Sequence, residues 1–202
     1  MHKPPLGALR PPSHRTLLVD AMRELTQGQG FAATTVDEVC ERAGVTKGSF
    51  YHHFASKDEL GVAALQAYFD DVLGAFKSGD WSTRSGPVAQ LHAFVAHAAN
   101  VCSGPTMRGG CLLGAFALEQ AGTVPATREL LSSMFGELRC VVAGLILAAS
   151  EPVGRTVRAE ALAEEFLAIV EGAVVLAKAH ADPDLPRRLL ACFDEHLSLL
   201  LG

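Results

Sequence analysis

The chain has 202 residues, 49% of them hydrophobic, so it is long enough to bury a sizeable core without metal or disulfide cross-links. Its formal net charge of −5 argues against a protein that binds nucleic acid over its whole surface. Residues 1–60 carry seven basic and seven acidic side chains, so the entire negative excess lies beyond residue 60.

Aromatic residues are few, and no segment alternates polar and apolar residues between hairpin turns, so the composition predicts an all-α fold. The cysteines are five in number and widely spaced, with no CxxC pair and no accompanying histidine cluster. We therefore expect no disulfide framework, no metal site and no cofactor. The cysteines are Cys40, Cys102, Cys111, Cys140 and Cys192.

The first nineteen residues contain basic side chains and four prolines but no acid. This composition predicts a flexible N-terminal arm over residues 1–12, which either lies along DNA or has no role. The charged start is not followed by a continuous apolar segment, so no secretory signal is expected. The longest uninterrupted apolar run, residues 141–149, is too short to span a bilayer. We expect a cytoplasmic protein that does not enter a membrane.

Beyond the arm, apolar residues at helical spacing predict an amphipathic helix over residues 14–28, broken by Gly30. The segment from Thr35 to Glu59 then contains two S/T-x-x-E capping boxes, each of which marks the start of a helix. After the first box an apolar stripe ends at Gly44, a glycine typical of a helix C-terminus. Together these signals predict a three-helix bundle that contains a helix-turn-helix.

The second helix of this motif is predicted over residues 46–54. Phe50 and Phe54 share its inner face, so Gly48 and His52 lie on the opposite face. A glycine inside a helix costs roughly 1 kcal/mol relative to alanine, and a close approach of the backbone to DNA would justify that cost. The alternative is a surface helix with a chance glycine.

Residues 34–60 resemble the DNA-binding domain of the TetR family of bacterial transcriptional regulators, and the preceding helix resembles it more loosely. The resemblance implies that residues 13–55 form the DNA-binding domain and residues 56–202 a helical ligand-binding and dimerisation domain. It implies phosphate contacts from Thr34, Thr35 and Lys57. The implied contacts of the helix that enters the major groove are Thr46, Lys47, Gly48, Ser49, Tyr51, His52 and His53.

In the remaining sequence, six further helices are predicted. They run from residue 56 to a loop at 79–87, from 87 to a break at 104, from about 111 to 122, over about 125–149 and 157–179, and from about 186 to 201. The helices at 125–149 and 157–179 are apolar on more than one face, which indicates a partner surface. The family resemblance implies a homodimer in which these two helices of each subunit form a four-helix bundle.

Members of this family enclose a small-molecule site between their central helices. Candidate lining residues are aromatic, apolar or polar side chains of the predicted central helices and loops, although core packing is the alternative for each apolar one. They are Trp81, Phe94, His97, Val101, Met107, Cys111, Phe116 and Glu119.

Cys111 is predicted to lie in the first turn of a helix, three residues after Arg108, and both features would lower the pKa of its thiol. The segments RGGCLLGAFALE and EGAVVLAKAH resemble a TetR subgroup in which some members use this cysteine to sense oxidants or electrophiles. That resemblance suggests that Lys178 lies near Cys111 and stabilises its thiolate. The alternative is a buried cysteine that only packs.

The sequence thus favours a ligand-responsive, homodimeric repressor that binds a palindromic DNA operator and is released by a small molecule or by modification of Cys111. Activation of transcription remains an alternative. Two other classes stay open: a thiol-dependent enzyme that pairs Cys111 with His97, and a helical adaptor that holds another protein.

Overall fold

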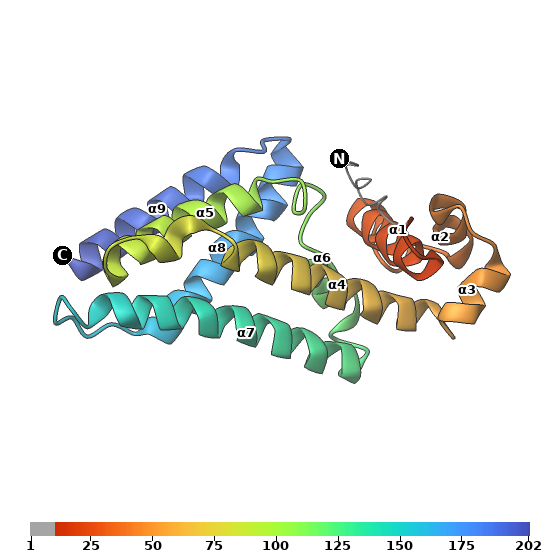
Figure 1. Cartoon of the computed structure of the whole chain (residues 1–202), viewed down its shortest axis with the longest axis horizontal. Coiled ribbons are helices and arrows are strands. Elements are labelled where there is room, and N and C mark those ends of the chain that lie inside the picture. The colour runs from red at the N-terminus through yellow and green to blue at the C-terminus, as the bar shows by residue number, and fades with distance from the viewer. Residues whose placement is uncertain (1–10) are drawn as a thin grey trace, which may run out of the picture.

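In the computed structural model, which describes residues 11–202, the chain folds into nine α-helices and one short 3-10 helix (Figure 1). The predicted all-α class is confirmed. Residues 1–10, and with them most of the predicted N-terminal arm, lie outside the described residues.

The first three helices form a bundle, called the head below, at one end of the molecule (Figure 1). They are α1 (His14–Gln29), α2 (Val36–Ala43) and α3 (Lys47–His53), and each matches its predicted range to within a residue or two. The core of the head contains Leu18, Met22, Val39 and Phe50, all fully buried. Gly44 ends α2 at a φ of 66°, a left-handed conformation that favours glycine, and turns the chain into α3.

Of the two predicted capping boxes, the first is complete. The Thr35 hydroxyl accepts from the Glu38 N–H, and the Glu38 carboxylate accepts from the Thr35 N–H. At the second, the Ser56 hydroxyl accepts from the Glu59 N–H, but the Glu59 carboxylate accepts from the N–H of Ala55, one residue before the cap. The helix still begins where the pattern predicts.

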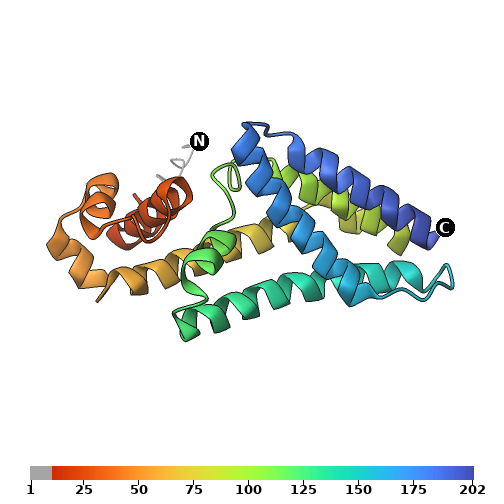
Figure 2. The ribbon, with the colours of Figure 1, turned by 180° about the vertical axis from the view of Figure 1, so that it is seen from behind.

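That helix, α4 (Lys57–Lys77), runs from the head into a larger helical body (Figures 1 and 2). The body also contains α5 (Pro87–Cys102), α6 (Leu112–Gln120), α7 (Pro125–Ser150), α8 (Ala159–His180) and α9 (Leu185–Leu201). The stretch predicted as a loop after α4 contains the 3-10 helix η1 (Asp80–Thr83). Here the Trp81 ring N–H donates at 2.8 Å to the carbonyl of Phe76, five residues earlier, a contact that periodicity does not reveal.

Helix α7 is long and apolar enough, by length and composition alone, to cross a membrane, with a mean hydropathy of 1.7 over its most apolar stretch. The predicted absence of a membrane span rests on the longest uninterrupted apolar run, residues 141–149, which is only part of this helix. In the structure α7 contacts α4, α5, α6 and α8, and its apolar residues at helical spacing face these neighbours. A single such helix is weak evidence for a membrane span.

Head and body also meet directly, through the ring of Phe31 in the α1–α2 loop. This ring is 2% exposed and lies 4.6 Å, centroid to centroid, from the ring of Phe116 in α6. It lies against Gly61 of α4, where an added Cβ would stand 2.6 Å from a Phe31 ring carbon. The head is therefore packed against the body and is not only carried on the end of α4.

We expect Gly61→Ala to destabilise the protein by about 1–3 kcal/mol, because the added methyl group overlaps the ring of Phe31. Gly74→Ala is the matched control on the same helix. It has open space around its Cα and should stabilise the protein by about 0.5–1 kcal/mol. Urea unfolding of both variants checks this; equal effects would show that the close packing at Gly61 has no energetic weight.

Candidate nucleic-acid interface and effector cavity

Helix α3 is anchored by two buried phenylalanines and exposes its other side. Phe50 and Phe54 are 0% and 2% exposed, and the Thr46 hydroxyl caps the helix by accepting from the Ser49 N–H. The outward residues are small or polar, and the Tyr51 side chain is 60% exposed. Because no other described element covers this face, α3 is free to approach a macromolecule.

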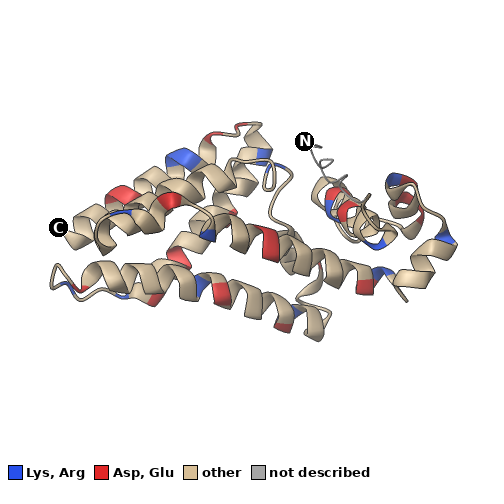
Figure 3. Ribbon diagram, viewed as in Figure 1, with Lys and Arg blue, Asp and Glu red and all other residues tan. Residues whose placement is uncertain are grey.

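Polar contacts tie the start of α3 to its neighbours. The ammonium of Lys47 lies 2.7 Å from the carboxylate of Asp37, and this hydrogen bond raises the pKa of Lys47. The Ser49 hydroxyl lies 2.8 Å from Nδ1 of His14. Acidic and basic residues are interspersed along the helices of head and body (Figure 3). Lys47 would have to exchange Asp37 for a phosphate when it binds DNA.

The structure does not present Thr34, Thr35 and Lys57 as the free phosphate contacts that were expected. Thr34 is fully buried, and its hydroxyl donates to the Gly30 carbonyl, so it is not presented to a ligand. Thr35 is exposed, but its amide and hydroxyl are both bonded to Glu38.

Lys57 differs most from expectation. Its ammonium donates to the carbonyls of Phe31 at 3.0 Å and Thr34 at 2.9 Å, more weakly to that of Ala32, and lies 4.4 Å from the centroid of the Phe31 ring. These three carbonyls belong to the α1–α2 loop, and that of Phe31 also accepts from the Thr34 N–H at 3.2 Å. The lysine therefore holds this loop against α4 in the structure, instead of projecting free toward a phosphate.

We expect Lys57→Ala to lower the free energy of unfolding by about 1–3 kcal/mol, because it removes the donor from partly buried carbonyls. Lys47→Ala, at an exposed side chain, should leave stability nearly unchanged. Chemical unfolding and DNA-binding titrations at several salt concentrations check both variants. Unchanged stability of Lys57→Ala, with a salt slope reduced by about 1, would instead support a phosphate contact.

A cavity of about 710 Å³ lies where the end of α1 faces the body. Its walls are the C-terminal turn of α1 with Gly30, the glycines at 109 and 110 and most of the length of α6, one residue of α7 and the C-terminal half of α8. The lining residues are Thr26, Gln27, Gly28, Gln29, Gly30, Gly109, Gly110, Cys111, Gly114, Ala115, Ala117, Leu118, Glu119, Phe135, Glu171, Gly172, Val174, Val175 and Lys178. It therefore adjoins the head and the body at once.

Hydrogen bonds between head and body border this cavity. The Glu119 carboxylate accepts from the N–H groups of Phe31 at 3.0 Å and Ala32 at 2.6 Å. The Gln27 side-chain amide donates to the carbonyls of Thr106 and Gly110. The Lys178 ammonium donates to the Gln27 carbonyl at 2.7 Å. A molecule entering here would meet every one of these links.

The structure does not gather the eight predicted lining residues into one site. Trp81, Phe94 and His97 form a separate cluster, in which Trp81 stacks edge-on to Phe94 at 5.4 Å and His97 Nε2 lies 2.7 Å from the Ala75 carbonyl. Phe116 is part of the core beside Phe31, and Val101 packs half-buried against the core.

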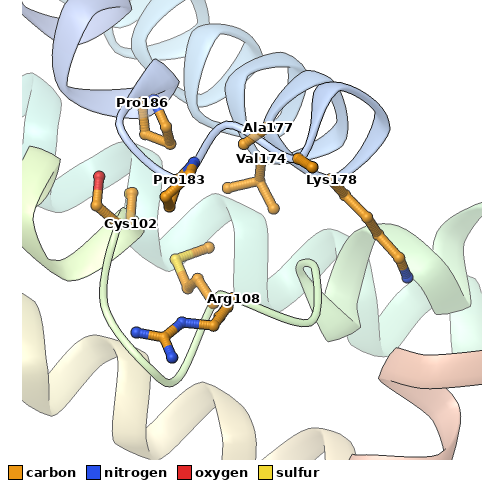
Figure 4. Close-up of a pocket in the computed structure, with 10 residues that line it drawn as sticks. Cys102, Arg108, Val174, Ala177, Lys178, Pro183 and Pro186 are labelled. Carbon is orange, nitrogen blue, oxygen red and sulfur yellow. The ribbon is translucent and has the colours of Figure 1, made fainter.

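Only Cys111 and Glu119 of the predicted set line the 710 Å³ cavity. The predicted Met107 lines a different cavity, of about 460 Å³, between α5, α8 and α9. Figure 4 shows that the charged ends of Arg108 and Lys178 point away from the gap between Val174 and Pro183 in that second cavity. Its centre is thus apolar, with no converging charged groups.

The expected low pKa of Cys111 is wrong. Burial, followed by the nearby Glu171 carboxylate, raises the pKa of this thiol well above its usual value. Lys178 is not among the groups that act on the thiol, because its ammonium is bonded to the carbonyls of Gln27 and Gly109. Cys111 occupies the N-cap position of α6, where its side chain makes no capping hydrogen bond. His97 lies in the other cluster, so the structure does not bring together the pair that an enzyme would need.

At neutral pH we expect iodoacetamide to alkylate the exposed Cys140 at least about 10-fold faster than the half-buried Cys111, because the raised pKa of Cys111 reduces its thiolate and partial burial reduces access. Peptide mass spectrometry over a time course measures the two rates, and the unfolded protein provides the reference in which they should converge. Faster labelling of Cys111 in the folded protein would restore the reactive-thiol hypothesis.

Sequence reasoning missed Glu171 and Gln27. Glu171 is the first residue of the segment EGAVVLAKAH, and an acid within an otherwise apolar stretch of helix was a usable signal. Gln27, at the polar end of α1, gave no signal, because its partners lie 79 and 83 residues away in the chain.

The chain matches two family models that together span most of its length. Residues 18–64 match the bacterial regulatory proteins of the tetR family, and residues 87–193 match the tetracyclin repressor-like C-terminal domain. The transcriptional regulator AcuR of Cereibacter sphaeroides is 29% identical, with 91% of this chain and 84% of AcuR covered. The HTH-type transcriptional repressor DhaR of Mycobacterium sp. strain GP1 is 27% identical, with 81% and 82% covered.

Solved structures of bacterial regulators have a similar fold over most of the chain. A regulatory protein TetR from Rhodobacter sphaeroides superposes with a TM-score of 0.77 at 27% identity, covering 89% of this chain and 96% of that one. A TetR transcriptional regulator from Chloroflexus aurantiacus gives a TM-score of 0.79 at 25% identity, covering 92% and 94%.

Proposed function

This chain belongs to the TetR family of bacterial regulatory proteins, and on that premise we propose that two copies of it bind a palindromic operator and release it when a small molecule enters the cavity beside α1. It is a DNA-binding transcriptional regulator, and we propose repression as its mode. The observation that supports this most directly is the free outer face of α3, held in place by Phe50 and Phe54. A regulator of this kind acts in the cytoplasm, where its DNA is.

In the proposed complex, α3 enters the major groove. Gly48 lets the backbone approach the duplex, and Lys47, Tyr51 and His52 offer side chains to base edges or phosphates. Two heads bound to one face of DNA would lie roughly 34–36 Å apart, one helical turn, and would read two half-sites of opposite orientation. Ser49 and His53, less exposed, complete the expected contact surface.

We propose that the dimer forms through the outward face of α8. This face carries small or apolar exposed residues at helical spacing: Ala161, Ala168, Gly172, Leu176 and Ala179. A groove beside it, formed with α9, contains Ile169, Leu189 and Cys192. Such an apolar stripe on a soluble surface favours a partner of the same shape.

The same reasoning favours α9 as the second helix of the interface, in place of the predicted α7. The outward residues over the first half of α7 are mainly charged or hydroxylated, including Arg128, Glu129, Ser132 and Ser133. On α9, an exposed Leu199 continues the line of Leu189 and Cys192. An apolar four-helix contact therefore fits α8 and α9 better.

We expect Leu176→Glu to yield monomers, because the new charge would be buried against the partner's apolar face. Leu147→Glu, at an equally exposed leucine of α7, should remain dimeric. Light scattering of both variants distinguishes a 21.3 kDa chain from its dimer. The reverse pattern would place α7 in the interface, and a monomeric unmodified protein would favour an adaptor.

Ligand control would act through the contacts between α1 and the body. A molecule in the cavity lies between the α1 C-terminus and α6, so it competes with the arrangement in which Gln27 and Glu119 join head to body. The ligand shifts the head only to the extent that it binds one head position better than the other. By linkage, operator DNA must weaken ligand binding by the same factor.

The experiment that tests the function is selection of genomic fragments by the purified protein, followed by footprinting. We expect an inverted repeat with half-sites about one helical turn apart. His52→Ala should change the selected bases within each half-site, whereas His180→Ala, at an exposed histidine that ends α8 and is not part of α3, should not. Equal retention of all fragments, with no motif, would contradict a sequence-specific regulator.

A further inference from the structure

One acid in the wall of the 710 Å³ cavity has no charged partner. Glu171 of α8 forms no salt bridge with any lysine, arginine or histidine in the described part of the chain. Burial raises the pKa of its carboxyl group, and the Cys111 thiol, which donates to it, only partly offsets this effect. A partly buried acid without a cationic partner lowers the stability of the folded protein. Such a group is more readily explained by a role in binding than by a role in folding.

The backbone makes room for this acid. A side-chain carbon at Gly114 of α6 would overlap the Glu171 carboxylate, so the absence of a side chain there allows the carboxylate to reach the start of α6. The polar part of this wall is thus formed by the Glu171 carboxylate and the neighbouring Cys111 side chain.

Another wall, the last turn of α1 at residues 26–30, already has a cation, because the Lys178 ammonium donates to the Gln27 carbonyl at 2.7 Å. Of the other charged groups lining the cavity, Lys178 is bonded to two backbone carbonyls and Glu119 to two backbone amides. Glu171 is the charged group left without such partners.

The rest of the lining is apolar. Leu118 and Val175 are 87% and 59% exposed at the edge of the cavity, unusually high values for large aliphatic side chains, and Phe135 and Ala115 lie deeper in its wall. These side chains would be covered by the body of a bound molecule. Polar recognition at one end and apolar contact elsewhere is the ordinary composition of a small-molecule site.

We propose that the effector is a small, mainly apolar molecule with a protonated amine, and that this amine pairs with the Glu171 carboxylate. This assignment rests on the proposed role of the cavity as the effector site. The ammonium group would supply the charge-assisted hydrogen bond that Glu171 lacks, and the apolar part would cover Leu118 and Val175. An anionic head group would be repelled by Glu171 and would have to displace the carbonyls that hold Lys178.

Three probes of equal skeleton test the head group: 2-phenylethylamine, 2-phenylethanol and phenylacetate, each titrated into the full-length protein by calorimetry at constant ionic strength. We expect the amine to bind about 10- to 100-fold more tightly than the other two, the range of a hydrogen bond to a charged group. Glu171→Gln keeps the shape of the side chain and should abolish that preference. Glu164→Gln, an exposed acid on the same helix but outside the cavity lining, is the matched control and should keep it.

The outcomes separate the head group from the site. A preference for phenylacetate, a preference for the amine that survives Glu171→Gln, or no amine binding at millimolar concentration would each overturn the proposed head group. Operator binding is measured in parallel, together with Ala115→Trp, which fills the cavity. If phenylacetate weakens operator binding and Ala115→Trp prevents this, the cavity is supported as the effector site. The proposed amine head group is then contradicted. If the amine binds with the expected preference but leaves operator binding unchanged, the assignment of the head group is supported. The proposal that the cavity controls operator binding is then contradicted.

Discussion

The seating of Phe31 between Gly61 and Phe116 is the contact on which the arrangement of the molecule depends. It places an aromatic ring from the head in the core of the body, where burial of such a ring is worth several kcal/mol on truncation. The same placement brings the polar backbone groups of the loop within reach of two charged side chains. Lys57 satisfies the carbonyls of the loop that carries Phe31, and Glu119 satisfies its amides. Without the ring in place, neither charged side chain would have its partners.

This arrangement gives a physical basis for communication between the cavity and the DNA-binding face. The C-terminal end of α1 forms one wall of the cavity, and the N-terminal end of the same helix reaches α3 through His14 and Ser49. A rigid helix that touches both places transmits a displacement at one end to the other. The cavity therefore lies where a small molecule can act on the orientation of α3 while touching only backbone and side chains near Gln27 and Glu119.

In the structure, Cys111 has a raised pKa in place of the low pKa that its local sequence predicts. Its position at the start of a helix was correctly anticipated, but position alone does not fix the pKa of a thiol. Burial and the carboxylate of Glu171 act in the opposite direction to the helix dipole, and they prevail. Glu171 comes from 60 positions further along the chain, so no local reading of the sequence around Cys111 could include it.

Local signals in the sequence determined the helices, the caps at Thr35 and Ser56, the glycine turn at Gly44 and the inward face of α3, because each depends on side chains within a few residues of one another. Only the tertiary structure decided which polar groups meet across the chain. Lys57 became a support for the α1–α2 loop, and Glu119 a link from body to head. Such pairings depend on the distance between folded elements, which periodicity along one helix does not encode.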